Sequence, residues 1–265
     1  EKNYEITSLR KDVLTDGRHA KVQFTEDWSH DASRRDFSIN SIYSDIHGNL
    51  FDPYDGRLDL KNGKINFIGN PDERIKEDYL RILRYIRFFL NYSNLPHEEK
   101  IKKVIRQNIN GIKNLSKERL IDELRKIFTS KKFINLAKDQ FILELIGLIF
   151  PELKNINIFK KLNDDAIKLL PKKDFIFLIS VALIDNSDNS DYFIFKYNLS
   201  NKAKDRIKFI KAYYYKVFEK NFFSEKNLNK IYYYNGLQYV QDLIDFKIFN
   251  SKNISKNLIK LKKMY

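Results

Sequence analysis

The sequence contains no cysteine among its 265 residues, which excludes disulfides, thiolate metal sites and a cysteine nucleophile. No apolar run reaches the ~20 residues that a membrane-spanning helix needs. The first residues also lack the charged and apolar pattern of a signal peptide. These absences predict a soluble intracellular protein that does not enter a membrane, and we expect it in the cytoplasm.

Positive charge is in excess, with 49 lysines and arginines against 35 aspartates and glutamates, a net charge of +14 and a pI near 9.5. Such a surface attracts a polyanion such as nucleic acid. An AT-rich genome explains the abundance of Lys, Asn, Ile, Phe and Tyr equally well, so the charge alone does not identify the partner. The length and the 43% hydrophobic content predict about two domains with an ample core.

Hydrophobic periodicity separates a β-containing start from a helical remainder. Alternation predicts strands at 4–10 and 20–25 around a turn at 15–18, a hairpin at 45–51 and a short strand at 64–68. A helix is predicted within 34–43. From residue 72 the period becomes 3.6, with helices at 74–91 and at 117–129, the second capped by Ser116. Expected breaks are Pro96, Pro151, Pro171 and the loop 185–191. The fold class is therefore α+β.

Residues 77–89, EDYLRILRYIRFF, form a strongly amphipathic pattern. On one continuous helix Asp78 and Arg81 lie ~60° apart. A carboxylate accepts from an exocyclic amine and a guanidinium donates to ring acceptors, as on the edges of cytosine and adenine. Guanine and uracil present a carbonyl in place of the amine. The pattern therefore indicates a base-reading pair, and its alternative is the solvated charged face of a helix packed on a core.

Residues 34–40, RRDFSIN, place two cations suited to phosphates before an acid, a hydroxyl and an amide suited to ribose hydroxyls. Further short motifs accompany them in a fixed order: EITSLR at 5–10, DGR at 16–18, DPYDG at 52–56, EDYLRILR at 77–84, and LSKERL at 115–120 with Glu123. Over about residues 1–128 this order resembles the class II tRNA nucleotidyltransferases, which are the CCA-adding enzymes and bacterial poly(A) polymerases. Two departures are Ser38, where the family usually has threonine, and a single glycine, Gly56, where two are common.

The resemblance implies a partial nucleotidyltransferase head over residues 1–60, an all-helical neck over 61–140 that recognises the nucleotide, and a helical body and tail over 141–265 that bind tRNA. It assigns Arg35 to the triphosphate, and Asp36 and Asn40 to the ribose. It assigns base recognition to Asp78 and Arg81.

Two more arginines of the same helix, Arg84 and Arg87, would support nucleotide binding according to the resemblance. On an ideal continuous helix Arg87 points ~180° from Asp78. It would then reach the same nucleotide only over the helix end or by wrapping round the helix.

The family's head begins with a glycine-rich basic segment and an Asp-x-Asp strand that holds two Mg²⁺ ions, and neither motif occurs in this sequence. Glu5 matches the third acidic position and is the predicted catalytic and metal-binding residue. Two-metal chemistry needs clustered carboxylates. We therefore expect an N-terminally truncated or split enzyme, inactive without a segment or partner chain that carries Asp-x-Asp. The alternative for Glu5 is an exposed strand residue between Tyr4 and Ile6.

The activity implied is addition of C and A nucleotides from CTP and ATP to the 3′ end of tRNA, without a nucleic-acid template. One alternative is a bacterial poly(A) polymerase, which would keep Asp78 and Arg81 and accept other RNA ends. Another is a non-catalytic RNA-binding part of a split enzyme. Two tyrosine runs, 213–215 and 232–234, either stack on RNA bases or lie at the edge of the helical core.

Overall fold

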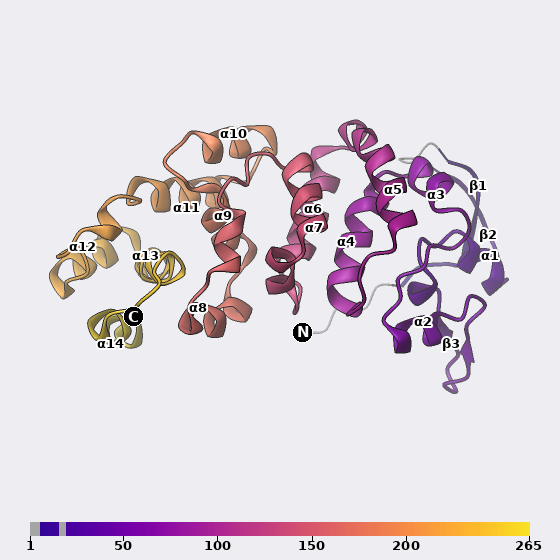
Figure 1. Ribbon diagram of the computed structural model, residues 1–265, viewed down its shortest axis with the longest axis horizontal. Coiled ribbons are helices and arrows are strands. Elements are labelled where there is room, and N and C mark those ends of the chain that lie inside the picture. Colours follow the sequence, from indigo (N-terminus) through magenta and orange to yellow (C-terminus); the bar gives the residue numbers. More distant parts are fainter. Residues whose placement is uncertain (1–5, 16–19) are drawn as a thin grey trace. The chain divides into compact units, whose positions relative to one another are not determined.

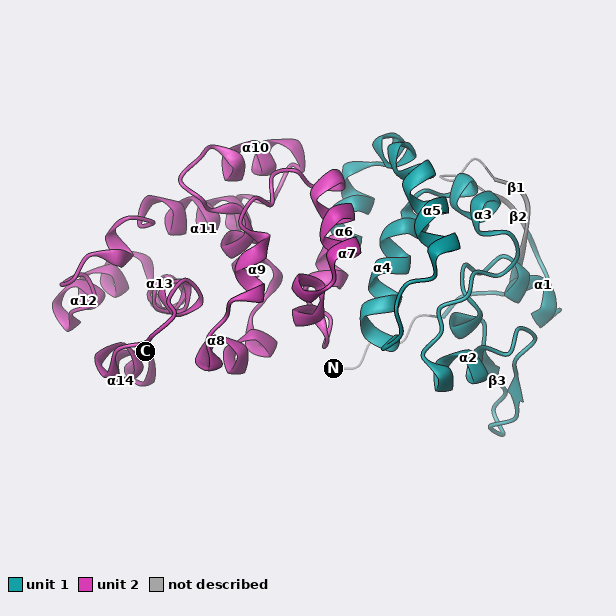
Figure 2. Ribbon diagram, viewed as in Figure 1, with its two compact units in different colours: residues 1–123 teal, residues 124–265 magenta. Residues whose placement is uncertain are grey.

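The computed structural model describes residues 6–15 and 20–265 of the chain, which divides into two compact units, residues 1–123 and 124–265 (Figure 2). Short antiparallel hairpins occur only near the start of the described part, and helices make up most of the rest (Figure 1). The α+β expectation is confirmed. The domain boundaries expected at residues 60 and 140 stay predictions.

In the first hairpin, β1 (Arg10–Thr15) pairs with β2 (Ala20–Phe24). The predicted strand 4–10 is wrong over residues 6–9, which are not in a strand, while residues 4 and 5 lie outside the described part. Alternation alone does not make a strand, because a strand also needs a partner. Here the regular pairing stops at Arg10 and Phe24, since the chain then turns into helix α1 (Trp28–Ser33), whose first turn is capped by Asp27.

After α1 the chain turns at residues 34–36, and only Phe37 is extended before the single 3-10 turn η1 (Ser38–Asn40), so the helix predicted within 34–43 is wrong. Backbone hydrogen bonds join this segment to residues 66–68: Ser38 N–H donates to Asn66 O and Ile68 N–H to Asp36 O, both at 3.0 Å. This pairing is an isolated bridge between Phe37 and Phe67, so the strand predicted at 64–68 is wrong too. The Phe37 ring, fully buried, fixes the bridge.

The hairpin predicted at 45–51 is confirmed as β3 (Tyr43–Ser44) paired with β4 (Leu50–Phe51). Its tip is stabilised by Asp45, whose Oδ1 accepts from the N–H groups of His47 and Asn49 at 2.8 Å each.

The helix predicted at 74–91 is two helices, α3 (Pro71–Glu77) and α4 (Leu80–Tyr92). Asp78 between them is extended, with φ −154° and ψ 104°. Its carboxylate accepts from Leu80 N–H at 3.1 Å, so the side chain binds a free N–H group at the start of the second helix. The remaining helices of this unit are α2 (Gly56–Asn62), α5 (Glu99–Asn108) and the start of α6 (Lys117–Phe128). Ser116 caps α6 as predicted, accepting from Arg119 N–H.

The second unit consists of helices: α7 (Gln140–Ile149), α8 (Asp164–Leu169), α9 (Phe175–Leu183), α10 (Asn189–Lys196), α11 (Asn201–Ala212), α12 (Glu225–Asn235), α13 (Leu237–Phe249) and α14 (Lys256–Met264). Pro96, Pro151 and Pro171 mark breaks as predicted, while the loop expected at 185–191 ends at Asp188. None of the helices described is long and apolar enough to cross a bilayer.

Two fully buried carboxylates organise the second unit around α13. Asp242 accepts from the Arg206 guanidinium of α11 at 2.6 and 2.8 Å. Asp245 pairs with Lys173 and with Lys262 of α14. Because a buried charge is costly without a partner, these pairs specify which helices pack against α13.

Gly56 lies where the first helix after the β3–β4 hairpin approaches the η1 turn. A Cβ at this position would lie 2.2 Å from the Ser38 carbonyl oxygen, so only glycine fits. Asp55 before it has φ 53°, a left-handed conformation that aspartate tolerates and glycine favours. The single glycine of the DPYDG turn therefore stands at the position of close approach.

We predict that Gly56→Ala lowers the free energy of unfolding of the first unit by about 1–3 kcal/mol, because the added methyl group meets backbone that cannot move freely. The measurement is urea unfolding followed by the fluorescence of Trp28, the only tryptophan, which packs against Tyr43 and Phe51.

The control is Gly147→Ala in α7, where an added Cβ meets nothing within 4 Å. It should leave the Trp28 transition unchanged and raise helix stability by up to ~1 kcal/mol, seen by circular dichroism. A Trp28 transition unchanged in Gly56→Ala would show that the approach to Ser38 relaxes without cost.

Candidate functional site

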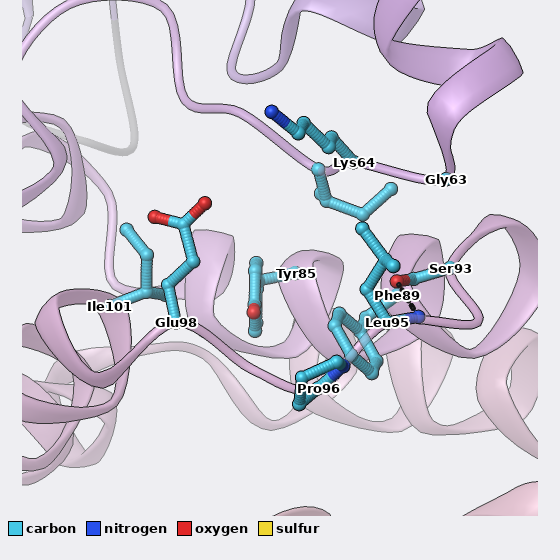
Figure 3. Close-up of a pocket in the computed structure, with 10 residues that line it drawn as sticks. Gly63, Lys64, Tyr85, Phe89, Ser93, Leu95, Pro96, Glu98 and Ile101 are labelled. Atoms are coloured by element: carbon cyan, nitrogen blue, oxygen red, sulfur yellow. Dashed lines mark hydrogen bonds between the residues drawn. The ribbon is translucent and has the colours of Figure 1, made fainter.

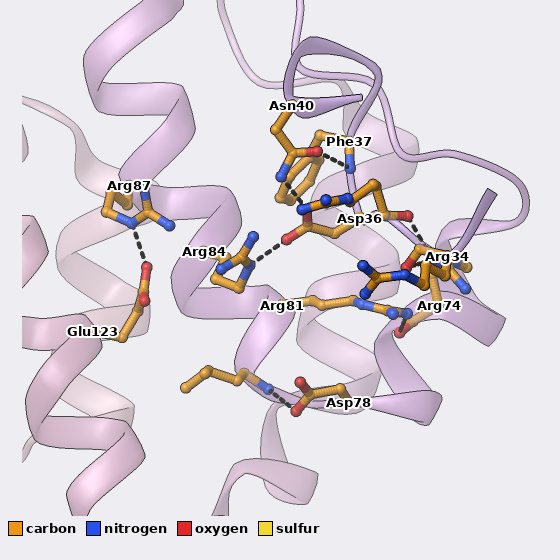
Figure 4. A network of polar contacts seen from close by, with 12 residues as sticks. Arg34, Asp36, Phe37, Asn40, Arg74, Asp78, Arg81, Arg84, Arg87 and Glu123 are labelled. Atoms are coloured by element: carbon orange, nitrogen blue, oxygen red, sulfur yellow. Dashed lines mark hydrogen bonds and ion pairs between the residues drawn. The ribbon is translucent and has the colours of Figure 1, made fainter. Parts of the chain in front are cut away.

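Three arginines of α4 form a row along the helix, at Arg81, Arg84 and Arg87. Each guanidinium pairs with a carboxylate from a different segment. Arg81 pairs with Glu77 at the end of α3. Arg84 pairs with Asp36 before η1, and Arg87 with Glu123 in α6 (Figure 4). Residues three apart are neighbours on a helix surface. Helix α4 therefore brings three sequence motifs to one row of half-buried charges.

Asp36 is almost completely buried, as is Glu123 of the same row. Arg84 Nε donates to its Oδ2, and Asn40 Nδ2 donates to its Oδ1 at 2.5 Å. Burial raises the pKa of Asp36, but the Arg84 guanidinium and the Asn40 amide outweigh burial and hold it below its ordinary value. The structure thus brings together three of the predicted site residues and keeps the central one ionised.

Arg35, predicted to contact the triphosphate, is paired in this structure. Its guanidinium donates to Asp31 Oδ2 at 2.9 and 3.2 Å, and the guanidinium of Arg34 donates to Asp31 Oδ1. Burial raises the pKa of Asp31, yet the Tyr43 hydroxyl and the two arginines lower it well below its usual range. Sequence reasoning missed Asp31, although its spacing of three and four residues from the arginines was a readable signal.

Arg74 connects the Arg34–Arg35 segment to α4, and sequence reasoning missed this role. Its Nη2 donates to the carbonyl oxygens of Arg34 and Arg35 at 2.7 and 2.5 Å, and its Nη1 donates to Glu77 at 2.6 Å. Glu77 also accepts from Arg81 Nη1 at 2.6 Å.

Arg81 keeps part of its guanidinium available. Both of its side-chain hydrogen bonds to described residues use Nη1, one to Glu77 and one to the Arg74 carbonyl at 2.5 Å. In the described part of the chain, Nε and Nη2 have no hydrogen-bond partner. They form the edge that could meet two ring acceptors of a ligand.

Asp78 is not on α4, so the ~60° separation from Arg81 expected on one helix is wrong, and so is the argument that places Arg87 ~180° away. Its Oδ2 accepts from Arg119 Nη2 at 2.6 Å and its Oδ1 from Leu80 N–H. An ionised carboxylate has about four acceptor positions, so capacity remains for a ligand amine.

Arg87 pairs with Glu123, the acid that follows the LSKERL motif, and lies over the Phe88 ring at 4.5 Å. Ser38, by contrast, is buried, and its hydroxyl donates to Asp59 at 2.5 Å. That hydroxyl joins two segments of the first unit and does not point to a ligand.

Glu5 lies outside the described residues. Among the residues that the structure does describe, no three histidines, aspartates or glutamates come together in a way that could hold a metal ion.

A small cavity lies beside Tyr85 and Phe89 of α4, bounded also by Lys64 and Glu98 (Figure 3). Its volume of about 50 Å³ holds one or two water molecules, whereas small-molecule sites occupy roughly 300–1,000 Å³. Its lining includes none of the predicted site residues. The arginine row with Asp36 and Asp78 holds five of the predicted site residues and is the candidate site.

Two family models match the sequence, one described as "Poly A polymerase head domain" over residues 1–66 and one as "Probable RNA and SrmB- binding site of polymerase A" over residues 94–157. The chain is 44% identical over 177 residues to "CCA tRNA nucleotidyltransferase 1, mitochondrial" of Mus musculus, which covers 65% of this chain and 40% of the mouse protein. It is 35% identical over 222 residues to the "CCA-adding enzyme" of Oceanobacillus iheyensis, covering 80% and 54%. The chain thus spans about half the length of these curated relatives.

Solved structures share the fold. The Bacillus stearothermophilus CCA-adding enzyme in complex with CTP matches with a TM-score of 0.72 at 22% identity, covering 99% of this chain and 62% of that one. The Thermotoga maritima CCA-adding enzyme in complex with tRNA matches with a TM-score of 0.63 at 21% identity, covering 89% and 60%. The ordered motifs, the two family models and the named relatives together show that the chain belongs to the family of class II CCA-adding enzymes and poly(A) polymerases.

Proposed function

We propose that this chain is part of an enzyme that adds C and A nucleotides from CTP and ATP to the 3′ end of tRNA. The observation that carries the proposal is the hydrogen-bonding capacity that remains on Asp78 and on Arg81, two residues joined at the start of α4 by the bond from Arg81 N–H to Asp78 O at 3.0 Å. Asp78 offers an oriented acceptor with capacity remaining, and Arg81 offers two donors without a partner among the described residues. An acceptor and donors contributed by these two residues together match the edges of cytosine and adenine.

The other predicted residues supply binding and support. Arg35 would contact the triphosphate by sharing its guanidinium between Asp31 and a phosphate oxygen, and it is the more exposed arginine of that pair. Asp36 and Asn40 would accept and donate at the ribose. Arg84 and Arg87 would act through Asp36 and Glu123, which they hold in place.

The proposed reaction is in-line attack of the tRNA 3′-hydroxyl on the α-phosphate, which releases pyrophosphate. The side chains named above orient the nucleotide for that attack. Mg²⁺ is the proposed cofactor, and when bound it would neutralise the triphosphate. Glu5 is the one proposed ligand, and the described residues supply no further cluster for it. The proposed location is the cytoplasm, although the mouse and human relatives are mitochondrial.

The distribution of charge supports tRNA binding by the second unit. Residues 124–265 hold 27 of the 49 lysines and arginines and 14 of the 35 acids, which gives them a net charge of +13 and leaves +1 for residues 1–123. Long-range attraction to a polyanion therefore belongs almost entirely to residues 124–265.

The tyrosine runs differ in exposure. In the first run Tyr213 and Tyr214 are half-buried, as at the edge of a core, and Tyr215 is exposed. The three rings of residues 232–234 on α12 are all exposed, so they are available to stack on unpaired bases.

A poly(A) polymerase is the second candidate, because both matching family models are described by that name. It would use the same base-reading pair for adenine. Binding of CTP as well as ATP, and preference for tRNA over other RNA, separate the two candidates.

We predict that Arg81→Ala and Asp78→Ala each weaken binding of CTP and ATP by about 1–3 kcal/mol, the usual range for a bidentate base contact. Binding of UTP and GTP should weaken less, so the preference of the chain for CTP and ATP should decrease. The measurement is equilibrium dialysis of the 265-residue chain against each labelled nucleotide.

The control for this test is Lys76→Ala, which removes an exposed ion pair with Asp72 on α3 and should leave all four affinities unchanged. If both site variants keep the wild-type preference, α4 is only a charged face packed on a core.

We predict that log affinity for tRNA falls linearly and steeply with log salt concentration, because phosphate contacts release condensed counterions. At ~150 mM salt, tRNA should still compete better than unstructured RNA of equal length, since backbone geometry is then recognised as well as charge. Filter binding across a salt series measures both. Equal affinity for the two RNAs would leave a generic polyanion binder or a poly(A) polymerase relative.

A further inference from the structure

Arg119 reaches the proposed base-reading carboxylate from a distant part of the sequence. It lies in the first turn of α6, and its Nη2 donates to Asp78 Oδ2 at 2.6 Å across a separation of 41 residues. The backbone N–H of Arg119 donates to Ser116 Oγ, so the cap of α6 also fixes the residue that carries the guanidinium. Residues of the LSKER motif therefore both supply and position the guanidinium that binds Asp78.

A second contact from the same part of the chain holds the residue after Asp78. A Cβ on Gly111 would lie 2.0 to 2.3 Å from ring atoms of Tyr79, so the tyrosine ring lies directly on the Gly111 backbone. Gly111 belongs to the 3-10 segment η2 (Ile109–Asn114), just before α6. Residues 78 and 79 are thus both restrained by the segment 109–119.

This restraint matters because Asp78 is the extended residue that follows α3, and it belongs to neither α3 nor α4. Its backbone carbonyl accepts from Arg81 N–H at 3.0 Å, and its side chain is oriented by two other donors. Leu80 N–H holds Oδ1 and Arg119 holds Oδ2, and two donors on two oxygens define the plane of the carboxylate.

We propose that Arg119 is a positioning residue for nucleotide selection, which acts by fixing the carboxylate of Asp78 as an acceptor in one orientation. The inference rests on the proposed base-reading role of Asp78. A fixed acceptor rejects uracil and guanine because their carbonyl oxygen meets another acceptor and neither finds a proton. A carboxylate free to rotate turns away from that carbonyl, and the rejection weakens.

Exposure favours this role over a contribution to stability. The side chains of Arg119 and Asp78 are 30% and 21% exposed, and partly hydrated ion pairs add little to folding. The guanidinium geometry is what distinguishes Arg119 from a generic cation, because its planar fork fixes an angle that a lysine ammonium does not.

The experiment measures the ratio of CTP to UTP affinity of the 265-residue chain by equilibrium dialysis. Arg119→Ala should lower this ratio about 5-fold or more, within the range that a bidentate base contact spans. Arg119→Lys keeps the charge and should recover part of the ratio. In an Asp78→Ala background, Arg119→Ala should change the ratio no further, because the two residues act through one contact.

Lys76→Ala serves again as the control, and the urea midpoint of the Trp28 transition checks that each variant folds. An Arg119→Ala or Arg119→Lys protein with the wild-type ratio, beside an Asp78→Ala protein that has lost it, overturns the positioning role and leaves the base-reading role intact. An Asp78→Ala protein that keeps the ratio overturns the base-reading role itself.

Discussion

The ion pair between Asp36 and Arg84 is the constraint on which the first unit depends. Asp36 is almost completely buried, and a buried carboxylate without its partner is strongly destabilising. The next residue, Phe37, is then placed among the rings of Phe67, Tyr85 and Phe88, with centroids 4.7 to 6.4 Å away. Charge and aromatic packing together allow only one register of residues 34–40 against α4.

The parts of the fold that depend on local signals could be predicted from the sequence. The Ser116 cap predicted the start of α6, and the turn residues around Gly48 predicted the β3–β4 hairpin, because in each case the cause lies within a few residues. The break at Asp78 has a cause that the helical period hides, since apolar residues continue in phase on both sides of it. The bridge between Phe37 and Phe67 joins segments 30 residues apart, which no local pattern specifies.

The candidate site also has a part that the sequence predicts and a part that it does not. Sequence motifs named the residues whose chemistry suits a nucleotide, and the structure brings Asp36, Asn40 and Arg84 together. The partners that orient the others were not predicted. Arg74 and Arg119 act on carbonyl groups or side chains about 40 residues away, so their roles follow from tertiary contacts and not from spacing along the chain. Asp31 differs, because it lies three and four residues before its two arginines.

Arg74 has a mechanical consequence for the site. Its guanidinium bridges the carbonyl groups beside Arg35 to Glu77, which in turn holds Arg81, so the distance between Arg35 and Arg81 is set by the protein before any ligand arrives. A ligand that binds both residues must match that distance. Because the two side chains are already ordered, binding does not carry the entropy cost of ordering them. The site then selects a ligand by the distance between its phosphate and its base, as well as by the hydrogen-bonding groups on the edge of the base.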